Sequence, residues 1–231
     1  LRAKKILKLK IQKRKRKEWT FTPTELTTIY NTDFFSVKAA VTKKIEHLFS
    51  GVRDEIKNVI EKNKIIYPKE VDAVNGKIFK GENYLGLPYL MLDFPKHFSK
   101  DSVLAFRTMF WWGNFFSCTL HLQGKALEEY RKHLSPAHSK EKGVANTIFS
   151  HIGKDKKGCG IYICVNSNPW QYHYKKDNYL PIDKLSDSEL KKLLVEKEFV
   201  KLSRKISLTD YKKISRFARE SFLYLFPSEL S

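Results

Sequence analysis

The run from Gly153 to Gly160 has glycine spacing that is typical of a phosphate-binding loop. Such a loop holds phosphate oxygens with backbone N–H groups. It needs Lys and then Ser or Thr after its second glycine, where a strand leads into a helix. Cys159 and Gly160 occupy those two positions here, and the segment leads from a loop into a strand pattern. We therefore interpret it as a basic turn and predict no nucleotide cofactor.

Cysteine and histidine residues are too dispersed to predict a metal centre. Cys159 and Cys164 are five positions apart on a predicted strand, so their side chains point to opposite faces. Cys118 and His121 are also an odd number of positions apart on a predicted strand, so they too point to opposite faces and do not form a metal site together. No Gly-x-Ser-x-Gly element supplies a nucleophile with a base and an orienting group. The sequence therefore predicts no metal, no cofactor and no catalytic residue, and leaves open only an enzyme whose site is assembled from distant residues.

Arg107 is the residue that most favours a small-molecule site. It lies on one face of a predicted hairpin whose other members are apolar, namely Met109, Trp111, Phe116, Cys118 and Leu120. A buried charge that loses its partner costs roughly 3–5 kcal/mol, so this guanidinium must pair with a local carboxylate, reach past the sheet edge or bind an anion. His121, expected on the opposite face, is a second polar group. The alternative function is therefore a small-anion pocket, or an unrecognised enzyme, lined by Arg107, Trp111 and His121.

Positive charge is the strongest functional indication in the sequence. The chain holds 44 Lys and Arg against 25 Asp and Glu, a net charge of +19. Residues 1–18 contain ten of these bases and one acid, and the remaining residues still carry +10. A basic body behind a basic N-terminal arm indicates a polyanionic partner, of which nucleic acid is the commonest.

Three regions form the predicted nucleic-acid site: the arm, the aromatic loop from Asn168 to Lys176, and the last strand with the C-terminal helix. The loop offers rings for base stacking beside phosphate contacts, as on single strands, although it can equally plug the edge of the core. RNA or the ribosome is preferred because no helix motif for a major groove is visible. The predicted residues are Lys13, Arg14, Lys15, Arg16, Lys17, Trp170, Tyr172, Lys175, Lys176, Lys201, Lys205, Lys212, Arg216 and Arg219. A subunit that docks an acidic protein is a further alternative.

Composition indicates a folded chain in a reducing compartment. Hydrophobic residues make up 42% of the 231 and aromatic residues 13%, enough to form a core. Three cysteines and no visible secretory segment lead us to expect a cytoplasmic protein. The longest stretch without charge, Thr108 to Gly124, alternates with period two and is broken by Gly113-Asn114. It is therefore a hairpin and not a membrane span, and we expect no membrane partner.

The hairpin from Leu104 to Leu122 is the clearest predicted element. Gly113-Asn114 as a two-residue turn pairs Trp112 with Phe115 and places Arg107 opposite Leu120. Both faces are apolar, so the hairpin is expected at the centre of a sheet that is covered on both sides.

Helix and strand patterns surround this hairpin. Apolar residues at steps of three and four run from Val37 to Val59, which predicts a long helix over about 36–62. Further helices are expected over about 22–31, 124–134, 144–151, 186–195 and 209–226, and strands over 6–11, 87–94, 161–165 and 200–208, with a loop before Leu87. We predict an N-terminal arm (1–20) and a single α+β domain (21–231), a mainly antiparallel sheet with the central aromatic hairpin covered by helices.

The order of these elements resembles the YktB-like family of uncharacterised bacterial proteins over about residues 34–226. The similar strings are the Val37–Lys62 helix, Leu87-Pro88-Tyr89, Leu127-Glu128-Glu129-Tyr130 after the aromatic strand, Leu185-Ser186, and Phe222-Leu223-Tyr224-Leu225. The hairpin is longer here than in that pattern, and the basic arm lies outside it. The resemblance implies a compact α+β fold and no known activity, so it assigns no functional residue.

Overall fold

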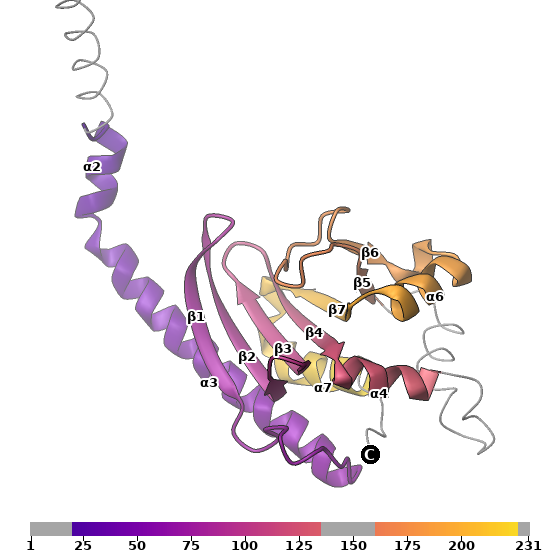
Figure 1. Ribbon diagram of the computed structural model, residues 1–231. Coiled ribbons are helices and arrows are strands. Elements are labelled where there is room, and N and C mark those ends of the chain that lie inside the picture. Colours follow the sequence, from indigo (N-terminus) through magenta and orange to yellow (C-terminus); the bar gives the residue numbers. More distant parts are fainter. Residues whose placement is uncertain (1–19, 135–159, 226–231) are drawn as a thin grey trace, which may run out of the picture. The chain divides into compact units, whose positions relative to one another are not determined.

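The computed structural model describes residues 20–134 and 160–225 (Figure 1). The predicted arm residues Lys13, Arg14, Lys15, Arg16 and Lys17, the strand expected over 6–11 and the helix expected over 144–151 lie outside the described residues. Contacts divide the chain into a unit of residues Leu1–Lys43 and a unit of residues Lys44–Ser231. The boundary that we expected at residue 20 stays a prediction.

The first unit contains the helix α2 (Pro23–Tyr30) and the beginning of α3 (Thr32–Lys62). The predicted capping box is confirmed: Thr22 Oγ1 accepts a hydrogen bond from the Glu25 N–H (3.2 Å), and the Glu25 carboxylate accepts one from the Thr22 N–H (2.6 Å). The helix α3 begins four residues earlier than expected, because the side-chain oxygen of Asn31 accepts from the Phe34 N–H (3.2 Å) and starts a new helix.

The second unit is built on a seven-stranded antiparallel sheet, which confirms the α+β class (Figure 1). The strand order is β1-β2-β3-β4-β7-β5-β6, so the aromatic hairpin β3–β4 is central as predicted. The strands are β1 (Lys77–Tyr84), β2 (Leu87–Phe98), β3 (Ser102–Trp111), β4 (Phe115–Gly124), β5 (Tyr162–Cys164), β6 (Tyr179–Pro181) and β7 (Phe199–Ser207). The helices are the rest of α3, α4 (Lys125–Leu134), α6 (Asp187–Glu196) and α7 (Ile214–Leu225), with short 3₁₀ helices η2 (Ile182–Lys184) and η3 (Leu208–Lys213).

The strand β1 was not expected from the sequence, where these residues were interpreted as a loop. It is an edge strand that pairs with β2 through Lys77 to Tyr84, with exposed lysines and a glycine that hide the alternating pattern. That glycine has a packing role: a Cβ atom on Gly81 would lie 2.4 Å from the ring of Tyr89. The glycine that indicated a loop in the sequence is therefore needed for a close contact between β1 and β2.

The predicted register of the hairpin is wrong by one residue. The turn has three residues, with Gly113 at φ 68° and Asn114 Nδ2 donating to the Trp112 carbonyl (2.8 Å), so Trp111 pairs with Phe115. Three-residue loops with glycine in the left-handed conformation are the next most common hairpin connection after two-residue turns. Since a shift of one residue in one strand moves its side chains to the other face, the membership of the two faces changes.

The two faces of the sheet are covered differently. On the helix face, Phe106 packs edge-on against Phe222 of α7 (ring centroids 5.1 Å), and Figure 1 shows α7 along the sheet. The part of α3 in this unit buries an apolar stripe that consists of Ile45, Phe49, Val52, Ile56, Val59 and Ile60. The loop face combines apolar, polar and charged side chains, namely those of Asp93, Arg107, Met109, Trp111, Thr119, His121, Lys201 and Ser203. The segment 166–178, the covering loop, lies over this second face.

Candidate functional site

The covering loop is held to the sheet by hydrogen bonds along its length. The backbone N–H groups of Tyr172 and His173 both donate to Tyr84 Oη, at 2.7 and 3.0 Å. Lys201 Nζ donates to the carbonyls of Pro169 (2.8 Å) and Gln171 (2.5 Å). Of the two hypotheses for this aromatic loop, the geometry therefore favours the one in which it closes the core.

Arg107 is paired inside the protein. Its Nε and Nη2 donate to the two carboxylate oxygens of Asp93 at 2.7 and 2.8 Å, and its Nη1 donates to Tyr172 Oη at 2.6 Å. Burial lowers the pKa of Arg107, but the hydrogen bonds and charge of Asp93 outweigh burial and raise it above the ordinary value. Asp93 stands opposite Arg107 in the β2–β3 register. The guanidinium of Arg107 is therefore paired with a carboxylate of the neighbouring strand β2, which argues against the hypothesis that it binds an external anion.

His121 and Trp111 lie on the same face as Arg107, whereas the sequence placed His121 on the opposite face. Trp111 is buried with Met91 and Met109 in an apolar cluster. His121 is 2% exposed, and neither ring nitrogen has a hydrogen-bond partner among the described residues. Burial lowers the pKa of His121 to about 3, and the charges of Lys201 and Arg107 act in the same direction. The imidazole is therefore a neutral group within the covered face.

Lys201 does not belong to the predicted basic surface. Its side chain points to the loop face, as the strand pattern predicted, but it is 1% exposed because the covering loop lies over that face. Burial lowers the pKa of Lys201 to about 8. Tyr172, which was predicted to stack on bases, instead accepts a hydrogen bond from Arg107 through its hydroxyl group. The prediction was wrong because it treated every lysine opposite an apolar strand face as solvated.

The remaining predicted cations lie on both sides of the sheet. On the loop side, Lys205 is exposed with its Nζ 4.8 Å from the centre of the Tyr174 ring, and Lys175 and Lys176 are exposed on the covering loop. On the helix side, Lys212 and Arg216 are exposed and Arg219 is half-buried. One continuous surface of all these residues is therefore not formed.

The helix side contains a cluster in which Arg216 and Arg219 were predicted from the sequence, whereas Arg204 and Glu220 were not. Arg216 Nε donates to Glu220 Oε1 at 2.8 Å. This hydrogen bond, with smaller contributions from the charges of Arg216, Arg204 and Arg219, lowers the pKa of Glu220. We call Arg204, Arg216, Arg219 and Glu220 the arginine surface. The sequence pattern placed Arg204 on a face of β7 that otherwise holds Val200, Leu202 and Ile206. A charged residue at such a position was the signal that could have indicated a special role for Arg204.

Aromatic rings of α7 support Arg204. Its guanidinium carbon lies 5.1 Å from the centre of the Phe217 ring and 5.2 Å from that of Tyr224, and its Nη1 donates to Ser221 Oγ at 3.2 Å. Stacking on rings fixes the plane of a guanidinium while leaving donors at its edge. Tyr224 is itself 46% exposed. The arrangement can present oriented donors to phosphate groups.

Residues 20–134 and 160–225 contain neither a cluster of metal-binding side chains nor a membrane-spanning helix. No three His, Cys, Asp or Glu side chains in these ranges come together as a metal site would require. No helix in the same ranges has both the length and the apolar character that a membrane span needs. Cys118 and Cys164 are buried free thiols, so neither of these two forms a disulfide.

Comparison with known proteins gives no identity for the chain. No protein-family model, no curated protein and no solved structure matches it. The resemblance to the YktB-like family therefore stays a prediction, as do the cytoplasmic location and the absence of a cofactor.

Proposed function

We propose that this chain binds nucleic acid, with RNA preferred, through phosphate contacts made by the arginine surface together with basic residues 1–18. The observation that carries the proposal is the grouping of Arg204, Arg216 and Arg219 around one carboxylate, that of Glu220. The four residues that define this surface in the described part of the chain are three arginines and one glutamate, and their formal charges sum to a positive value. Arginine is the side chain best suited to hydrogen-bond phosphate oxygens in pairs.

The charge of the surrounding sequence supports this location. Residues 199–219 contain seven Lys and Arg against one Asp. Lys201 is buried, but Lys205, Lys212 and Lys213 remain exposed. Of these three, only Lys213 forms an ion pair within the described part of the chain, with Asp210 at 2.7 Å. Lys212 and Lys213, which directly precede α7, therefore extend the arginine surface, whereas Lys205 lies on the loop side of the sheet.

The preference for RNA rests on the rings beside the guanidinium groups. Tyr224 and Phe217 flank Arg204, and Tyr211 at the start of this region is 46% exposed. Unpaired bases of single strands stack on aromatic side chains and on guanidinium planes, whereas bases of a duplex are stacked on one another. An alternation of rings and arginines therefore suits a single strand better than a duplex groove.

The test compares two double variants with the same loss of charge. Arg216→Gln/Arg219→Gln removes two cations of the arginine surface, and Lys191→Gln/Lys192→Gln removes two exposed lysines of α6. Binding of a single-stranded RNA oligonucleotide is measured by fluorescence anisotropy over a range of salt. We expect the arginine variant to reduce the slope of log K against log salt by roughly 1.4, since each phosphate contact on a single strand contributes about 0.7.

The control decides between a defined surface and diffuse attraction. The α6 variant should leave the slope nearly unchanged. Equal losses in both variants, or no binding by the unaltered chain at ~50 mM salt, would contradict the proposal. A polyglutamate competitor that displaces the RNA at equal charge would instead favour the alternative in which the surface docks an acidic protein.

A further inference from the structure

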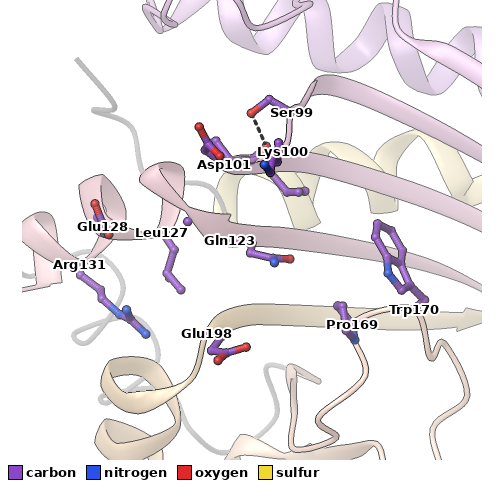
Figure 2. A pocket seen from close by; sticks show the side chains of 13 residues that line it. Ser99, Lys100, Asp101, Gln123, Leu127, Glu128, Arg131, Pro169, Trp170 and Glu198 are labelled. Carbon is purple, nitrogen blue, oxygen red and sulfur yellow. Dashed lines mark hydrogen bonds between the residues drawn. The ribbon is translucent and has the colours of Figure 1, made fainter.

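A cavity of about 530 Å³ opens beside the covering loop, away from the arginine surface. Figure 2 shows Trp170 at one end, Arg131 at the other and Gln123 between them. Its walls come from the β2–β3 turn, the end of β4, α4, the covering loop and the residue that precedes β7. A volume of this size is within the range of small-molecule sites, roughly 300–1,000 Å³.

Carboxylates outnumber the cations around this cavity, although the whole chain carries +19. Asp101, Glu128 and Glu198 come from three separate elements, and Figure 2 shows them around the opening. Asp101 and Glu198 form no ion pair with any residue in the described ranges, and Glu128 faces the charge of Arg131. Lys100 is the other cation of the lining, on the exposed turn.

The guanidinium of Arg131 is already used inside the protein. Its Nε donates to the Leu194 carbonyl at 3.0 Å and its Nη2 donates to the Lys197 carbonyl. Both carbonyls lie at the end of α6, where four helix carbonyls have no partner within the helix. Arg131 therefore caps α6, and this contact uses two of the five N–H donors of its guanidinium.

Trp170 gives the cavity an aromatic wall that is held in place. Its indole is 48% exposed, and its backbone N–H donates to Asn168 Oδ1 at 2.9 Å. The residues on either side, Pro169 and Gln171, are fixed by Lys201. His121 lies 5.5 Å from the indole, ring centre to ring centre. One part of the ring is thus buried against the sheet, and the exposed part can contact a ligand.

We propose that this cavity binds an alkylammonium group, as in a linear polyamine or a lysine side chain of a peptide. An indole attracts a cation, carboxylates on separate elements neutralise its charge, and the buried side chains of Val103 and Leu127 contact its methylene groups. This site is independent of nucleic-acid binding, because it shares no residue with the arginine surface.

The experiment titrates the full chain with spermidine by isothermal calorimetry, with 1,8-octanediol as the uncharged control. We expect saturable binding of spermidine and none of the diol. Glu198→Gln should weaken spermidine roughly fivefold, which is the upper range for one exposed ion pair. Trp170→Leu should weaken it by about threefold to tenfold through loss of the ring.

Glu61→Gln is the matched control, since it removes the same charge from the exposed end of α3, outside the cavity. It should leave the affinity unchanged. No binding at millimolar spermidine, equal weakening by Glu61→Gln, or full affinity in Glu198→Gln would each overturn the proposal. A trilysine peptide that binds more tightly than spermidine, with the same sensitivity to Glu198→Gln, supports the site and assigns its ligand to a polypeptide.

Discussion

The helix face and the loop face of the same sheet are completed by different kinds of structure. The helix face is mainly apolar, and α7 and α3 contribute rings and aliphatic side chains to it, as with Phe222 against Phe106. The loop face contains buried polar and charged groups, and a loop without regular structure covers it. A helix has used its own carbonyls internally, whereas a loop has carbonyls free to accept from a buried lysine. An irregular segment therefore suits a sheet face with buried charges, because its backbone carbonyls can accept hydrogen bonds from them.

The largest expected effect concerns the ion pair of the loop face. Asp93→Ala leaves the buried Arg107 without its carboxylate, and we expect a loss of roughly 3–5 kcal/mol in the free energy of unfolding, measured by urea denaturation. The double variant Asp93→Leu/Arg107→Met should lose much less, because no uncompensated charge remains. If the double variant is as unstable as Asp93→Ala, the loop face does not depend on charge pairing, and the contrast with the helix face disappears.

A smaller effect concerns the unpartnered imidazole of His121. Burial lowers its pKa from 6.5 to about 3 in the folded chain, so only the unfolded chain takes up this proton between those values. Stability should therefore fall as the pH falls through this window, by about 1.4 kcal/mol per pH unit. His121→Leu should have a flatter dependence of unfolding free energy on pH than the unaltered chain, in denaturation series at several pH values. The variant His47→Gln, at an exposed position on α3, is the control and should retain the full slope.

Local sequence patterns predicted most helices and strands of this fold, but they did not predict the contacts between segments that are distant in the sequence. The capping boxes at Thr22 and Ser186 and the central place of the aromatic hairpin were predictable, because they depend on neighbours within a few residues. The register was not, because a glycine turn of two or three residues gives the same pattern in the flanking strands. The choice determines which groups share a face with Arg107.

The candidate site was predicted less well than the fold. Lys212, Arg216 and Arg219 were assigned to a basic surface from helix periodicity, and they are exposed or half-buried on the helix side. Lys201 was misassigned, since periodicity gives the direction of a side chain but not whether a loop lies over it. Arg204 was missed because its guanidinium leaves an apolar strand face to stack on rings of α7. Such contacts depend on how distant elements pack.

Hydrogen–deuterium exchange with and without single-stranded RNA tests the central claim most directly, because it compares the two faces in one experiment. We expect RNA to slow exchange in η3 and α7, over residues 208–225, and to leave the covering loop, residues 166–178, unchanged. Protection of the covering loop without protection of α7, or no change anywhere in the chain, would contradict the assignment of nucleic-acid binding to the arginine surface.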